Sequence, residues 1–173
     1  MGRPRRFSEE TVLQVAATVF VRGGYEGTSI DDLVQALKLH RGSLYNAFGS
    51  KHGLFLAVLR RYVQTQLPAA INSVSPPGDG HPGVGALADG DDLDLLLIAA
   101  VERGHLDAEV AALVRHALTG LEQALEAEAN PGRSPNPASA PTRALDLLGE
   151  RLYQHLHGSD TPGTQHHDLT KEN

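Results

Sequence analysis

The chain has 173 residues, with 21 acidic and 15 basic side chains, a formal net charge of −6 and no cysteine. This length suits one domain, or a small domain with a second one appended, and the lack of cysteine excludes disulfides and thiolate metal sites. No apolar run approaches the length of a membrane span, and acidic residues interrupt the one stretch near the N-terminus that resembles a signal peptide. We therefore expect a cytoplasmic protein with no membrane partner.

The charge is distributed unevenly along the chain. Residues 1–66 hold nine Lys and Arg against five Asp and Glu, whereas residues 67–173 hold six against sixteen. A basic surface supplies the part of nucleic-acid affinity that does not depend on sequence, so the first third is the part expected to face a polyanion. The alternative is an ordinary solvated surface, and charge alone does not decide between the two.

Short helices are predicted in the first third of the chain. Ser8 is placed to cap a helix that carries glutamates in its first turn and ends at Gly23 and Gly24. Thr28, followed three residues later by Asp31, matches a capping box that opens a second helix with an apolar face.

A third short helix and a longer fourth one follow. The third begins near His40 or Arg41 and ends at Gly49, and Ser50 is placed to cap the fourth, which Pro68 ends or kinks.

The second half of the chain also has only helical periodicity. Residues 73–92 are too rich in glycine and proline for a long helix and predict a loop or a much reduced helix. Apolar character returns at Leu93, and apolar stripes then predict helices over 108–129 and 141–157. Residues 158–173 are polar, and we expect a disordered tail. Nothing alternates with a strand period, so the predicted fold class is all-α.

The second and third helices have the spacing of a helix-turn-helix, since about three residues, 38–40, separate them. In that motif the second helix enters the major groove of DNA. Leu39, Leu44 and Phe48 would fix it to the other helices, which leaves its polar residues exposed. Arginine contacts guanine and asparagine contacts adenine through paired hydrogen bonds, and each such pair discriminates between bases by about 1 to 3 kcal/mol.

The run GYEGTSIDDLVQALKLHRGSLYNAFGSKHGLFLAVL, with the helix before it, closely resembles the DNA-binding domain of the TetR family of transcriptional regulators. The resemblance covers roughly residues 7–62 and includes the pattern L-x-R-G-S-L-Y-x-x-F-x-S-K. It implies a homodimer with a three-helix DNA-binding domain in residues 1–50, a connecting helix over 51–66 and a helical domain over 67–157. The last of these serves dimerisation and often binds a small molecule that releases the operator DNA.

The resemblance also implies roles for individual residues. The candidates for reading bases are Arg41, Gly42 and Asn46. The candidates for phosphate contacts are Thr28, His40, Ser43, Tyr45 and Lys51. The candidate lining of an effector pocket, for which core packing is the competing explanation, is Phe55, Tyr62, Leu96, Ala100, His105 and His116. The candidate dimer interface, whose stripes could instead close the core of a monomer, is Val114, Leu118, Leu121, Leu125, Leu145, Leu148 and Leu152.

The sequence departs from the family pattern at the turn and in the third helix. Lys38 replaces the usual turn glycine, and a side chain there costs on the order of 1 kcal/mol if the residue keeps a positive φ. His40 replaces the usual serine, which is a better helix N-cap. Ala47 stands where many members have tyrosine or histidine, so one phosphate contact is expected to be missing.

Other motifs are set aside. Residues 78–83, GDGHPG, match the dinucleotide-binding spacing but lack the strand before it and the helix after it. The histidine pairs at 155 and 157 and at 166 and 167 have no ligand spacing that would close a metal site, so incidental solvated histidine is favoured. No catalytic residue, metal site or cofactor is predicted, and we do not expect an enzyme.

The preferred hypothesis is a dimeric repressor of the TetR type that binds a near-palindromic operator in double-stranded DNA and is released by a small-molecule effector. One alternative is a protein-interaction module that keeps the helix-turn-helix fold but has little specific DNA binding. The other is an enzyme or carrier for a small molecule, built in the helical second half.

Overall fold

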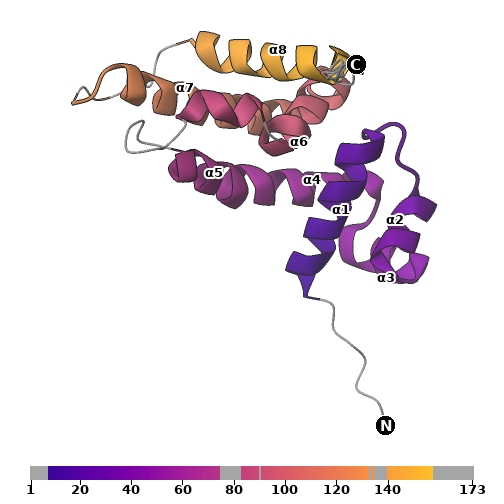
Figure 1. Ribbon diagram of the computed structural model, residues 1–173. Helices are drawn as coiled ribbons and strands as arrows, with labels where there is room; N and C mark the ends of the chain where they lie inside the picture. The colour runs from indigo at the N-terminus through magenta and orange to yellow at the C-terminus, as the bar shows by residue number, and fades with distance from the viewer. Residues whose placement is uncertain (1–7, 75–82, 90, 133, 135–139, 158–173) are drawn as a thin grey trace, which may run out of the picture.

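The computed structural model describes residues 8–74, 83–89, 91–132, 134 and 140–157, and no strand occurs among them. The predicted all-α class is confirmed. Figure 1 shows the first three helices grouped at one end, with α4 leading from them to a layered helical body. The predicted tail, the histidines at 166 and 167 and most of the GDGHPG run lie outside the described residues.

Helices α1 (Glu9–Gly23), α2 (Ile30–Leu37) and α3 (Arg41–Phe48) begin and end close to the predicted residues. The Ser8 side chain accepts a hydrogen bond from the Thr11 N–H, as an N-cap should. The third helix starts at Arg41 and stops before Gly49, whose φ of 74° a residue with a side chain rarely adopts.

The predicted capping box at Thr28 and Asp31 is wrong by one residue. The box is made by Ser29, whose hydroxyl accepts from the Asp32 N–H at 3.1 Å, and by Asp32, whose carboxylate accepts from the Ser29 N–H at 2.8 Å. Both pairs satisfy the same spacing, so the local pattern does not separate them. Thr28 is instead only 3% exposed, and its hydroxyl donates to the Gly24 carbonyl at 2.6 Å.

The fourth helix does not end at Pro68. Helix α4 (Lys51–Arg61) passes into a π-helical turn, η1 (Tyr62–Gln66), and then into α5 (Leu67–Val74). Proline lacks an N–H and crowds the carbonyl four residues earlier, here that of Gln64. Since Gln64 lies within the wider π turn, the helical rod continues through the proline.

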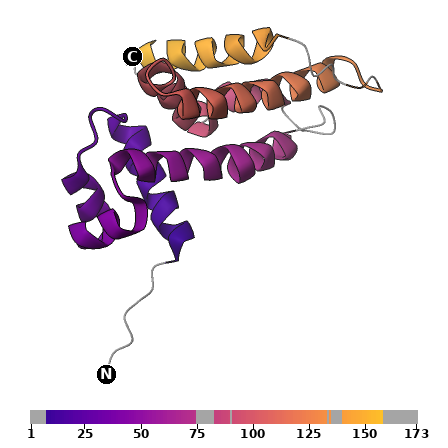
Figure 2. The same cartoon turned by 180° about the vertical axis from the view of Figure 1, so that it is seen from behind.

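The second half is a stack of helices. It contains the short 3-10 helices η2 (Val84–Ala88) and η3 (Asp91–Leu93), then α6 (Asp94–Ile98), the π-helical turn η4 (Ala99–Arg103), α7 (Ala108–Ala129) and α8 (Thr142–His157). The predicted bounds of α7 are confirmed, and α8 begins one residue later than predicted. In Figures 1 and 2, α7 lies between α8 and the rod of α4 and α5.

Two glutamates of α7 accept hydrogen bonds from backbone N–H groups at the starts of neighbouring helices. The Glu122 carboxylate is buried and accepts from the Ala144 N–H at 2.9 Å, at the start of α8. The Glu128 carboxylate accepts from the Val84 N–H at 2.6 Å, at the start of η2. The first N–H groups of a helix have no partner within the helix, so these acids satisfy them from outside.

A buried ion pair joins α6 to α8. The Arg151 guanidinium donates to both oxygens of Asp94, at 2.5 and 2.9 Å, and the His155 Nε2 atom lies 2.8 Å from the same carboxylate. Burial alone would raise the pKa of Asp94, but the hydrogen bonds from Arg151 and His155 hold it below its usual value. The His155 side chain is 44% exposed, as expected of a solvated histidine, but it is not incidental, because it is a structural partner of Asp94.

Candidate DNA-binding interface

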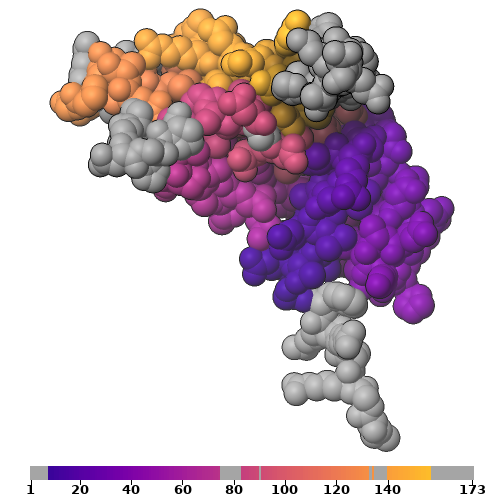
Figure 3. All heavy atoms as spheres, in the orientation of Figure 1, coloured from indigo at the N-terminus to yellow at the C-terminus, as the bar shows by residue number. Residues whose placement is uncertain are grey.

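Helix α3 is anchored by one face and exposed on the other. Leu44 is fully buried, and Phe48 and Leu39 are partly buried against the core. The remaining residues are exposed, and they include all three predicted base-reading residues and the predicted phosphate contacts of this helix: Arg41, Gly42, Ser43, Tyr45 and Asn46. Figure 3 shows that α1 to α3 form a lobe that projects from the rest of the molecule.

The start of α3 is open to a close approach. His40 occupies the N-cap position but makes no side-chain capping hydrogen bond, as expected for a residue that replaces serine. At Gly42, an added Cβ atom would meet nothing within 4 Å, so the backbone lies bare on this side. A helix start of this kind presents N–H groups and a positive dipole end to an anion.

Arg41 is held by a carboxylate of the preceding helix. Its Nη2 atom lies 2.5 Å from the Oδ1 atom of Asp31, in the first turn of α2. Both side chains remain largely exposed, at 55% for Arg41 and 79% for Asp31. Sequence reasoning singled out Arg41 but assigned Asp31 to a capping box and missed their pairing, because the pair depends on how the two helices cross.

Lys38 adopts the left-handed conformation that the family pattern implies. Its φ is 53° and its ψ is 37°, the αL region, at the C-cap of α2. Lys38 therefore keeps the positive φ of the usual turn glycine. Its side chain makes this backbone conformation less favourable than it would be for glycine.

Two predicted phosphate contacts have partners within the protein. The Lys51 ammonium donates to the carbonyls of Tyr25 and Thr28, at 2.8 and 2.9 Å, and lies 4.4 Å from the centroid of the Tyr25 ring. It thereby ties the start of α4 to the turn between α1 and α2. The Thr28 side chain is buried, and its hydroxyl donates a hydrogen bond to the Gly24 carbonyl. The hydroxyl is therefore not presented on the protein surface.

The same turn is also contacted by residues of η4. The Glu102 carboxylate accepts from the Glu26 N–H at 2.8 Å, and it lies so close to Gly24 that a Cβ atom there would be 2.5 Å from it. Arg103 stacks on the Tyr25 ring at 4.7 Å from its centroid. Burial raises the pKa of the Tyr25 hydroxyl above its usual value, although the nearby Arg103 acts in the opposite direction. We call the contacts of Glu102 and Arg103 with residues 24–26 the turn clamp.

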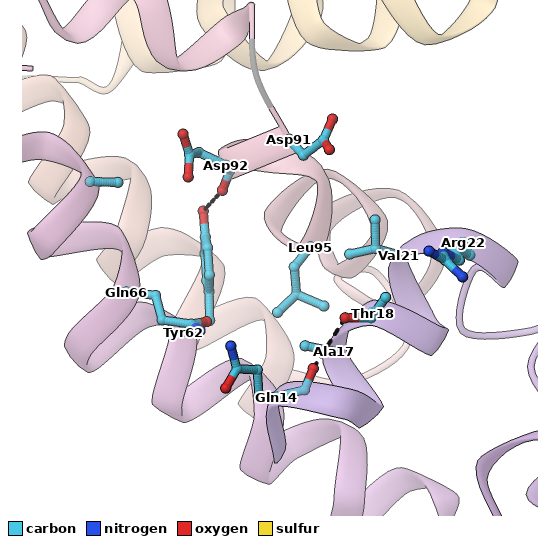
Figure 4. Close-up of a pocket in the computed structure, with 11 residues that line it drawn as sticks. Gln14, Ala17, Thr18, Val21, Arg22, Tyr62, Gln66, Asp91, Asp92 and Leu95 are labelled. Atoms are coloured by element: carbon cyan, nitrogen blue, oxygen red, sulfur yellow. Dashed lines mark hydrogen bonds between the residues drawn. The ribbon is translucent and has the colours of Figure 1, made fainter. Parts of the chain in front are cut away.

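A cavity of about 590 Å³ is lined by residues of α1, of η1 and α5, and of η3 and α6. Figure 4 shows Tyr62 and Gln66 on one side of it and Thr18 and Val21 of α1 on the other, with the Tyr62 hydroxyl donating to the Asp92 carbonyl. Among the predicted pocket residues, Tyr62 lines this cavity, whereas Phe55 and Leu96 are fully buried in the core. Ala100 is partly buried, and His105 and His116 are exposed.

The residues predicted to form a dimer interface divide into two groups. Within this chain, Val114, Leu118, Leu121 and Leu148 are buried in the core, and Leu125 packs against it. Leu145 and Leu152 are exposed, at 52% and 38%, and they lie on one face of α8 together with Leu156, at 72%.

Residues 12–58, which include most of α1 and all of α2 and α3, match the sequence model of bacterial regulatory proteins of the tetR family. Over 134 residues the chain is 34% identical to the HTH-type transcriptional regulator YezE of Bacillus subtilis, and the match covers 72% of this chain and 69% of YezE. The chain belongs to the TetR family. It is a helix-turn-helix transcriptional regulator, and the predicted architecture of a DNA-binding domain followed by a helical domain is confirmed.

Two further proteins resemble this TetR-family chain over different lengths. The HTH-type transcriptional repressor BdcR of Escherichia coli is 43% identical over 65 residues, which cover 38% of this chain and 33% of BdcR. A solved structure of the TetR family regulator CifR with 26-base-pair double-strand operator DNA has a TM-score of 0.57 and 26% identity, and covers 90% of this chain and 91% of CifR. Within the described ranges, no helix is both long and apolar enough to span a membrane.

Proposed function

We propose that the protein is a homodimeric repressor that acts in the cytoplasm, where it binds a near-palindromic operator and leaves it when a small molecule binds. The observation that carries this proposal is the outer face of α3, where Arg41 and Asn46 are exposed while Leu44 fixes the helix from below. The repressor BdcR and the operator complex of CifR are relatives whose activities support it.

In the proposed complex, α3 lies in the major groove. Arg41 contacts a guanine, Asn46 contacts an adenine, and the bare backbone at Gly42 lets the helix come close to the bases. His40, Ser43 and Tyr45 bind phosphates beside the groove. The Lys51 ammonium has three N–H donors, of which two bind the carbonyls of Tyr25 and Thr28, and the third contacts a phosphate. Thr28 contributes a phosphate contact only if its hydroxyl leaves Gly24.

The second copy of the chain places a second α3 in the next major groove on the same side of the DNA. In a helix-turn-helix dimer the two half-sites lie about 34 to 36 Å apart. We propose that the dimer forms through the exposed face of α8 that holds Leu145, Leu152 and Leu156, since exposed apolar side chains in a stripe mark an association surface. Residues 1–50 would then read DNA, 51–66 would connect, and 67–157 would hold the dimer together.

The proposed effector acts between these parts. The cavity beside Tyr62 has walls from α1, which belongs to the DNA-binding lobe, and from α6, which belongs to the body. A molecule that fits one separation of the two walls better than another shifts the population between them. In this proposal, the turn clamp at Glu102 and Arg103 couples a change in the separation of the cavity walls to the turn that precedes α2. No catalytic step is part of this proposal.

The test is fluorescence anisotropy of the purified protein on two labelled duplexes, the DNA upstream of its own gene and a scrambled sequence of equal length. Preference for the upstream duplex, with an affinity that falls steeply as salt rises, supports the proposal. Failure of a folded dimer to bind either duplex at low salt contradicts it and favours the protein-interaction module.

A further inference from the structure

We propose that Asp31 is a positioning residue for base recognition: it holds the Arg41 guanidinium toward one guanine of the operator and away from the phosphates. This inference rests on the proposed function, since it assumes that α3 reads bases.

The geometry of the pair is well suited to this task. Asp31 stands in the first turn of α2 and Arg41 is the first residue of α3, so both grow from helices rather than from loops. Buried leucines fix the two helices to the core: Leu33 and Leu37 from α2 and Leu44 from α3. The 2.5 Å contact between Oδ1 of Asp31 and Nη2 of Arg41 therefore orients the guanidinium relative to a rigid frame.

The contact leaves the arginine able to read a base. A guanidinium has five N–H donors in one plane, and the pair in this structure uses the Nη2 atom. Enough donors remain for the paired contact with the O6 and N7 atoms of guanine. An arginine that samples many rotamers loses more conformational freedom on binding, and the contact with the carboxylate reduces that loss.

The charge of Asp31 can add only a small amount of stability at the start of α2, and it opposes DNA affinity. An ion pair this exposed contributes little net stability. The N-terminus of α2 already has Asp32, whose pKa is held below its usual value by hydrogen bonds from Ser29. A carboxylate at a DNA-binding face also repels every phosphate, whatever the sequence. These costs make sense if Asp31 stops Arg41 from binding phosphate, because phosphate contacts carry no sequence information.

The structure therefore predicts opposite effects of Asp31→Asn on two quantities. Affinity for a random duplex should rise, and its salt dependence should steepen, because Arg41 becomes free to bind phosphate. Preference for guanine at the base pair that Arg41 reads should fall by about three- to tenfold, which is part of the discrimination that a paired contact supplies.

The experiment is selection of binding sites from a randomised duplex pool with the wild type, Asp31→Asn, Arg41→Ala and Asp31→Glu, followed by anisotropy on the selected site and on single-base variants of it. We expect Asp31→Asn to relax the same position of each half-site that Arg41→Ala relaxes, and Asp31→Glu to restore part of the preference. Glu9→Gln is the matched control: it removes one negative charge from the same lobe, in α1, and should leave the preference unchanged.

The outcomes separate this inference from the proposed function. If the wild type enriches no motif, the proposed function fails and the inference fails with it. If the wild type enriches a motif and Arg41→Ala relaxes one position, but Asp31→Asn leaves that position unchanged, only the inference is overturned. An Asp31→Asn protein that loses thermal stability but keeps its base preference would likewise show that the carboxylate has a structural role only.

Discussion

Replacement of Asp94 by asparagine should destabilise the protein more than any exposed substitution. Asp94 is 3% exposed and accepts hydrogen bonds from Arg151 and His155, and Arg151 itself is 9% exposed. Asparagine keeps the shape but has one acceptor oxygen, and its NH₂ group would face the N–H donors of the guanidinium. The result is a buried arginine without its main counter-charge.

Breaking a buried ion pair from one side costs about 3 to 5 kcal/mol. For a chain of this size that corresponds to a drop in Tm of roughly 6 to 20 °C. The assay is urea unfolding followed by circular dichroism, with the free energy of unfolding compared at equal m-values. The control is Asp91→Asn: Asp91 pairs with the same guanidinium at 3.0 Å, but its side chain is 91% exposed, so the expected loss is under about 1 kcal/mol. Equal losses for the two variants, or a loss below about 1 kcal/mol for Asp94→Asn, would refute the reasoning.

The pH dependence of stability gives the same prediction a second test. The pKa of Asp94 is lower in the folded protein than its ordinary value, so the folded state favours the charged carboxylate. Its contribution is complete above the unfolded-state pKa of about 3.9 and is lost as the pH falls through the lower folded-state pKa. Urea unfolding from pH 7 to pH 3 should show the wild type losing stability at the acid end, whereas Asp94→Asn should lose less over the same range.

Three further predictions concern the turn, the clamp and the dimer. Lys38→Gly should raise stability by about 1 kcal/mol, or roughly 2 to 4 °C in Tm, because it relieves the positive φ of 53°; an unchanged or lower Tm in a thermal melt would contradict this. Glu102→Ala should speed hydrogen exchange of the Glu26 amide while the amides of α7 keep their protection, and exchange that changes equally in both places would argue against a local clamp. Leu152→Lys should convert the dimer to a monomer in sedimentation velocity without unfolding it, and a variant that stays dimeric would show that this face of α8 is not the interface.

The helix boundaries of the DNA-binding lobe were the most predictable part of the fold, because local chemistry fixes them. Ser8, Gly49 and Ser50 act through hydrogen bonds or dihedral angles within a few residues, so their positions can be found in the sequence. The capping box was misplaced because two overlapping pairs share one spacing, and the burial of Thr28 that decides between them depends on packing.

Several features that sequence reasoning missed depend on contacts between residues far apart in the chain. Asp94 and His155 are 61 residues apart, and Glu26 and Glu102 are 76 apart. The acidic surplus of the second half gave no sign that Glu122 would cap the start of α8. In the candidate site, the exposed face of α3 followed from the position of Leu44, whereas the partner of Arg41 required the angle between two helices.

The most direct test of the central claim is the ratio of affinities for a selected operator and a scrambled duplex, measured by anisotropy for the wild type and for Arg41→Ala at the same salt concentration. A sequence-reading dimer should prefer its operator by about a thousandfold or more. Because a dimer reads two half-sites, loss of Arg41 should remove about 2 to 6 kcal/mol of that preference, which is roughly thirtyfold or more. An Arg41→Ala dimer that is folded and keeps the full ratio would contradict the claim that α3 reads DNA through this residue.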